Sequence, residues 1–183
     1  MALEAQTEKF LQSKLDGFTP ETGLILGSGL GFFADSLEVE ERIPYDQIPG
    51  FPQSTVAGHA GNLVAGHCEG HPVLCFQGRF HYYEGYPLAK VVLPVEVIHC
   101  LGGRRLIVTN AAGGINASFS EGDLMLICDH INFLGANPLR GPNEERQGPR
   151  FPDMTEVYTP GLRDLARGAS KSTERAMITA ITT

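Results

Sequence analysis

The sequence predicts an α/β protein with a largely parallel or mixed sheet. Short apolar runs typical of strands alternate with segments whose apolar residues have helical spacing. Two of the runs, residues 22–26 and 105–109, end directly at glycine-rich turns. Because ligands on such sheets bind beyond the carboxyl ends of the strands, these two turns are candidate binding loops.

The helices are predicted from apolar residues three and four positions apart. An N-terminal amphipathic helix is expected to end near Gly17, and another is expected to begin around Phe32 after the first glycine turn. A later helical pattern contains Pro94, which predicts a kinked helix or one that begins late. The patterns with defined limits cover residues 2–15, 88–101 and 162–169.

The strands are predicted from short apolar runs bounded by turn residues. Two of them flank Glu69 and Gly70, which indicates a hairpin. The last two of the strands below are expected to be buried. The five predicted strands cover residues 22–26, 62–67, 72–76, 105–109 and 123–128.

One domain is expected over residues 1–183, since this length suits a single core. Residues 168–183 are set apart as an atypical tail, because residues 170–183 contain no predicted strand, no glycine turn and few apolar residues. An open sheet that stopped here would leave an edge strand or a bare face, so the sheet is expected to be incomplete at the C-terminus.

Composition narrows the classes of function. The net charge of −7 argues against nucleic-acid binding but leaves room for a small anion bound by backbone N–H groups and one arginine. Four scattered cysteines lack metal-ligand spacing, so no metal is expected. The sequence contains no secretory signal and no run long enough to span a membrane. A soluble protein in the reducing cytoplasm is therefore expected.

The first glycine turn, Gly-Ser-Gly-Leu-Gly at residues 27–31, follows a predicted strand. Glycines allow the backbone to present N–H groups to an anion, and the Ser28 hydroxyl adds a donor. A plain tight turn is the alternative. A dinucleotide-binding dehydrogenase is excluded by spacing, because its third glycine would stand at position 32, which is Phe32.

The second motif, Gln-Gly-Arg-Phe-His-Tyr-Tyr-Glu-Gly-Tyr at residues 77–86, concentrates polar and aromatic side chains. The planar donors of Arg79 suit phosphate, and His81 can donate to an anion or a sugar hydroxyl. Alternation places these two on one side, while tyrosines can pack against a sugar. A solvated surface segment is the alternative.

Two further features are compatible with ligand binding. Thr-Asn-Ala-Ala-Gly-Gly at residues 109–114 follows a strand, and its small side chains allow a ligand to approach the backbone. His59 lies between glycines in a setting compatible with a mobile binding loop. Neither signal is specific alone.

Five motifs in this order resemble the trimeric class of purine nucleoside phosphorylases: GSGLG, GFPQSTVAGHAG, QGRFHYYEGY, TNAAGG and NPLRGPNEER. The resemblance implies a three-layer αβα fold and the reversible conversion of a purine ribonucleoside and phosphate into the free base and ribose 1-phosphate. It implies a homotrimer and no cofactor, phosphate being a co-substrate. Methylthioadenosine phosphorylases share the fold but differ at the Arg/His motif QGRFHYYEGY and at the strand-end motif TNAAGG, so they rank second.

The resemblance also implies roles for individual residues. His81, Arg79 and His59 match catalytic positions, and Tyr83 matches a tyrosine that contacts the ribose. Asn110, Ala111, Ala112 and Gly113 match a turn beside the base and sugar. The phosphate-binding positions are Ser28, His59, Arg79, His81 and the backbone of Ala111.

Two departures from the family pattern qualify this expectation. Gln147 stands where the family more often has a phenylalanine offered across the trimer interface. The segment that grips the purine is not recognisable after about Arg167, which suggests a truncated or altered chain. A catalytically inactive remnant that keeps the phosphate-binding part is therefore the alternative, and little or no turnover of inosine or guanosine is expected from these 183 residues.

Overall fold

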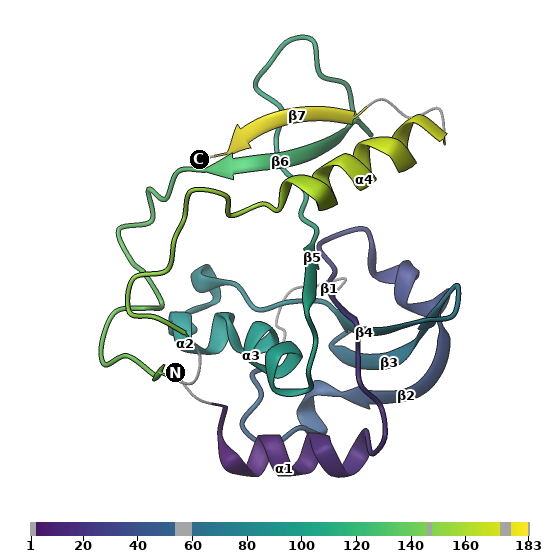
Figure 1. Ribbon diagram of the computed structural model, residues 1–183, viewed down its shortest axis with the longest axis vertical. Helices are drawn as coiled ribbons and strands as arrows, with labels where there is room; N and C mark the ends of the chain where they lie inside the picture. Colours follow the sequence, from purple (N-terminus) through teal and green to yellow (C-terminus); the bar gives the residue numbers. More distant parts are fainter. Residues whose placement is uncertain (1–2, 54–59, 146–147, 173–176, 183) are drawn as a thin grey trace. The chain divides into compact units, whose positions relative to one another are not determined.

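The computed structural model describes residues 3–53, 60–145, 148–172 and 177–182, so His59 and Gln147 lie outside the described residues. The chain divides into two compact units, Met1–Ala111 and Ala112–Thr183 (Figure 1). The expectation of a single domain over the whole chain stays a prediction.

The first unit is built on a five-stranded sheet in the order β2-β3-β4-β1-β5. Strand β1 pairs in parallel with β4 and with β5, whereas β2, β3 and β4 are antiparallel. The predicted α/β class with a mixed sheet is confirmed. The strands are β1 (Thr22–Ile25), β2 (Glu38–Pro44), β3 (Asn62–Cys68), β4 (His71–Gln77) and β5 (Arg105–Val108).

Both faces of this sheet carry a buried apolar cluster, because successive side chains of a strand point to opposite faces. In β4, Leu74 and Phe76 belong to one cluster, while Val73 and Cys75 belong to the other. Residues of α1 (Ala5–Lys14) and α3 (Leu93–Cys100) join the first cluster. The short 3₁₀ helix η1 (Gly31–Asp35) contributes to the second.

The helices confirm one expectation and correct another. The pattern over residues 88–101 forms two helices, α2 (Leu88–Val91) and α3. Pro94 divides them because it lacks an N–H and its ring would clash with the carbonyl four residues earlier in a continuous helix. The helix expected from Phe32 is only the single turn η1. The chain then enters strand β2, which lies at the sheet edge and is rich in charged residues, so its apolar signal is weak.

In the second unit, strand β6 (Leu124–His130) pairs in parallel with β7 (Met177–Thr182). Helix α4 (Pro160–Ser172) lies between these two strands in the sequence. The expectation that residues 170–183 hold no strand is wrong. The segment Met-Ile-Thr-Ala-Ile-Thr is rich in β-branched residues, but its threonines lower its hydrophobicity. None of the helices within the described residues has the length and apolar character needed to cross a bilayer.

The predicted burial of the strands at residues 105–109 and 123–128 is wrong. Leu106, Ile107 and Val108 of β5 are between 40% and 52% exposed, and β6 is intermediate to exposed along its length. Strand β5 is an edge of the five-stranded sheet, with β1 as its neighbour on one side. An apolar run shows that a strand can be buried but does not show what covers it.

Candidate active site

Three loops begin at one edge of the five-stranded sheet. Strands β4, β1 and β5 are adjacent and parallel, so residues 78–81, 27–31 and 109–111 leave the sheet at its carboxyl edge. Pairing continues to this edge: Leu26 N donates to Phe76 O at 3.0 Å, and Thr109 N donates to Ile25 O at 3.0 Å. The loops that carry the three motifs therefore start side by side.

Thr109 contacts both of the other loops. Its hydroxyl accepts a hydrogen bond from Gly27 N at 2.9 Å, and its carbonyl accepts one from Arg79 Nη1 at 3.0 Å. A Cβ added at Gly27 would lie 2.5 Å from the Thr109 oxygen, so only glycine permits this approach. Thr109 is the first residue of the motif at residues 109–114, but the sequence predicted no role for it in the site. The signal that could have identified it is a hydroxyl residue at a strand end beside a glycine turn.

The backbone around Arg79 is fixed on both sides. Tyr45 Oη donates to the Gly78 carbonyl at 2.8 Å, and the Phe80 ring is buried against Tyr45 with centroids 5.3 Å apart. Burial raises the pKa of Tyr45 well above its ordinary value, so this hydroxyl stays a donor. Burial lowers the pKa of Arg79, but a guanidinium stays protonated in proteins. The site thus holds a half-buried, positioned cation.

His81 is oriented by a buried carboxylate. Glu84 Oε1 lies 2.8 Å from both the backbone N and Nδ1 of His81, and the Glu84 side chain is 3% exposed. Such a contact places a proton on Nδ1 and fixes the ring plane. Tyr83 stacks on the ring, with centroids 4.7 Å apart. Sequence reasoning missed Glu84, although a polar residue followed by glutamate three positions later is typical of a capping box.

The first glycine turn borders an open hollow of about 360 Å³. Gly29 has φ +82°, a left-handed conformation that lets the turn reverse and leaves Ser28 exposed. Backbone donors, a hydroxyl and a guanidinium are the groups that bind anions. The hollow is lined by Gly27, Gly29, Gly31, Phe32, Asp35, Ala60, Gln77 and Gly78.

Comparison with known proteins decides the family. Residues 21–182 match the model of the phosphorylase superfamily. The chain belongs to the phosphorylase superfamily. It is 58% identical to purine nucleoside phosphorylase 1 of Geobacillus stearothermophilus over 162 residues, which are 88% of this chain and 59% of that protein. It is 54% identical to the enzyme of Rattus norvegicus over 155 residues, or 83% of this chain and 54% of that one.

Solved structures of superfamily members agree with the fold. A purine nucleoside phosphorylase of Schistosoma mansoni, isoform 2, solved with cytosine and ribose-1-phosphate, has a TM-score of 0.86 at 41% identity, over 97% of this chain and 64% of that one. Another purine nucleoside phosphorylase, solved with ribose-1-phosphate, has a TM-score of 0.86 at 43% identity over 96% and 66%. The chain thus spans about three fifths of the length of such relatives.

The remaining candidate residues, 110–113, are exposed and lie at the boundary between the two units. Asn110 and Ala111 are exposed at the end of the first unit, where Asn110 Nδ2 donates to the Ala111 carbonyl at 3.2 Å. Ala112 and Gly113 are exposed and belong to the second unit. Over the described part of the chain, no group of three or more His, Cys, Asp or Glu side chains is arranged to hold a metal ion.

Proposed function

We propose that this chain carries the phosphate- and ribose-binding part of a purine nucleoside phosphorylase, which converts a purine ribonucleoside and phosphate into the free base and ribose 1-phosphate. The observation that carries the proposal is the junction at Thr109, where a glycine turn and Arg79 meet at the carboxyl edge of three parallel strands. The relatives that are purine nucleoside phosphorylases support the same activity.

Each residue has a role in the proposed reaction. The Ser28 hydroxyl, the Ala111 amide and Arg79 hold phosphate, and His81, kept in place by Glu84, donates to it. As the bond between the ribose and the base nitrogen breaks, its electron pair leaves with the base and positive charge develops on the ribose. The bound phosphate stabilises this charge and forms the new C–O bond at the anomeric carbon.

Other groups contact the rest of the substrate in this proposal. Tyr83 is exposed beside His81 and packs against the ribose, while residues 110–113 lie beside the base and sugar. His59 belongs to a loop near phosphate and sugar. Positioned donors and a cation supply the chemistry, so no metal or organic cofactor is proposed.

The proposed assembly is a homotrimer in the cytoplasm, with no nucleic-acid partner. Cys68 and Cys75 are free thiols in the structure, which suits a reducing compartment. The net charge of −7 disfavours contact with a polyanion. Light scattering coupled to size-exclusion chromatography measures the mass, and a mass other than three chains would contradict the trimer.

Titration of the purified chain with inorganic phosphate is the primary test. We expect saturable binding that Arg79→Ala weakens by about 10- to 100-fold, because hydrogen bonds to charged groups are worth about 1.5–3 kcal/mol. Arg105→Ala is the matched control: it removes the same charge from an exposed residue that pairs with Glu21. A folded chain that binds no phosphate, or equal losses in the two variants, would overturn the proposal.

Base release from inosine or guanosine in the presence of phosphate tests the reaction itself. Phosphate-dependent release of the purine supports phosphorolysis. Retained phosphate binding without base release supports the inactive alternative instead. A parallel assay with methylthioadenosine separates the second family, since faster cleavage of that substrate than of inosine would assign the chain there.

A further inference from the structure

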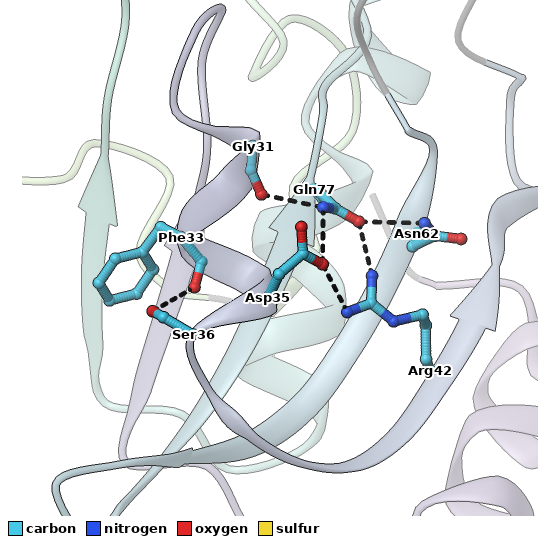
Figure 2. Close-up of polar contacts among 7 residues, drawn as sticks. All are labelled: Gly31, Phe33, Asp35, Ser36, Arg42, Asn62 and Gln77. Carbon is cyan, nitrogen blue, oxygen red and sulfur yellow. Dashed lines mark hydrogen bonds and ion pairs between the residues drawn. The ribbon is translucent and has the colours of Figure 1, made fainter.

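Gln77 is a buried amide at the end of β4, two residues before Arg79. Its side chain is 5% exposed, yet it contacts polar groups from three other elements (Figure 2). Its Nε2 donates to the Gly31 carbonyl at 2.9 Å. Its Oε1 accepts from Arg42 Nη1 at 2.8 Å and from Asn62 Nδ2 at 3.0 Å. A polar side chain buried this deeply is stabilised only if it is bonded in this way.

The partners determine which way the amide points. Arg42 and Asn62 present N–H donors, so the atom that faces them must be the amide oxygen. The NH₂ group then faces the Gly31 carbonyl, with Asp35 Oδ1 3.5 Å away. Arg42 Nη2 also donates to Asp35 Oδ1 at 2.9 Å, which closes the network. The amide is therefore held in one orientation.

This network holds the far end of the first glycine turn. Thr109 holds its beginning through Gly27 N, and Gln77 holds its end through the Gly31 carbonyl. Between these two anchors, residues 28–30 are exposed and Gly29 has a left-handed backbone. Both anchors stand at the ends of strands adjacent to β1. The position of the turn amides thus depends on two side-chain contacts, one at each end.

We infer that Gln77 is a positioning residue for the phosphate site: its amide fixes the glycine turn relative to Arg79, which lies two residues after it in the chain. The inference rests on the proposed function, because it assumes that the turn binds phosphate. Small displacements of binding groups weaken binding steeply, so an untethered turn should bind the anion less well.

The test measures the dissociation constant of inorganic phosphate for variants of the 183-residue chain. Gln77→Met keeps the length of the side chain and removes its hydrogen bonds, and we expect roughly tenfold weaker binding. Asn62→Ala is the matched control, because it removes a donor to the same amide oxygen but leaves the Gly31 contact. It should stay within about twofold of the parent chain.

A second variant guards against misfolding of Gln77→Met. Arg42→Lys keeps the positive charge, but an ammonium group cannot bond Gln77 and Asp35 together as a guanidinium does. A loss of phosphate affinity in this variant is therefore due to the lost hydrogen bonds of the Gln77 network and not to a lost charge. Titrations are repeated with an osmolyte that favours compact states. Restored affinity would mean that the role of Gln77 is merely to stabilise the fold, which would overturn the inference.

The outcomes separate the two proposals. If the parent chain binds no phosphate, the proposed function fails and the positioning role fails with it. If the parent binds phosphate and a folded Gln77→Met or Arg42→Lys variant binds equally well, only the positioning role is overturned. Weaker binding in these two variants, with Asn62→Ala unchanged and no rescue by the osmolyte, supports it.

Discussion

The two units of this chain are stabilised over different distances along the sequence. In the first, contacts join distant segments: Thr7 Oγ1 donates to the Pro49 carbonyl, and Arg79 reaches Thr109. In the second, beside the β6–β7 pairing, many hydrogen bonds span two or three residues, as between Thr155 and Asp153. Within residues 112–145 and 148–171, only Ser170 is buried. The candidate anion site lies in the first unit, at contacts that join residues far apart in the sequence.

The largest expected effect comes from deleting an aromatic ring in the first unit. Phe76 is 0% exposed, so Phe76→Ala should lower the free energy of unfolding by about 3–5 kcal/mol. Leu165, 71% exposed in α4, is the counterpart, and Leu165→Ala should change it by about 0.5 kcal/mol or less. Chemical denaturation measures both.

A variant that still folds keeps this test usable. If Phe76→Ala does not fold, Phe76→Leu retains most of the buried volume and should cost less than about 1.5 kcal/mol. Similar losses for Leu165→Ala and Phe76→Ala would contradict the comparison, because they would show that the second unit depends on packing as strongly as the first.

The two glycine-rich turns provide a smaller contrast. An added Cβ at Gly27 would clash with Thr109 O, so Gly27→Ala should cost about 1–3 kcal/mol of stability. At Gly113 nothing lies within 4 Å of an added Cβ, so Gly113→Ala should be neutral or stabilise by up to about 1 kcal/mol. Thermal unfolding of the two variants distinguishes them, and equal shifts would contradict the close approach at Gly27.

The sequence predicted the fold best where local pattern and long-range pairing agree. Strands β1, β3 and β4 were expected because their apolar runs end at turn residues. Strands β2 and β7 were missed, since charged or threonine-rich segments become strands only through the partner they pair with. Pattern alone carries no information about such partners.

The candidate site shows the same division. Arg79 and the first glycine turn are visible in the sequence because their residue types suit an anion. Thr109 and Gln77 hold those groups through contacts that join residues 30 to 82 positions apart. Glu84 holds His81 through a local contact, three residues away. Spacing in a single sequence predicts only the local pair.

Alkaline pH should destabilise the first unit through Cys75. Burial raises the pKa of this thiol from its ordinary 9.0 to about 12. Between these values the unfolded chain releases a proton that the folded chain keeps, so stability is full below pH 9 and falls as pH rises, by up to about 1.4 kcal/mol per pH unit. Cys75→Ala should flatten this slope, as measured by denaturation at several pH values. An unchanged slope would show that Cys75 is not the group responsible.

The smallest effect concerns a local turn of the second unit at acid pH. Thr155 donates to Asp153 Oδ1 from its hydroxyl at 2.6 Å and from its backbone N at 2.9 Å, and these bonds lower the pKa of Asp153. The turn therefore gains stability above the ordinary pKa of a free aspartate and loses it as pH falls through the lowered value. NMR titration of the carboxyl group should give a higher pKa in Thr155→Val than in Thr155→Ser, which keeps the hydroxyl.

Because both bonds are local, we expect the lowered pKa of Asp153 to persist in Phe76→Ala, which removes packing from the first unit. If the pKa returns to its ordinary value in Phe76→Ala, this turn depends on the core of the first unit, and the division between long-range and local stabilisation is wrong at this position.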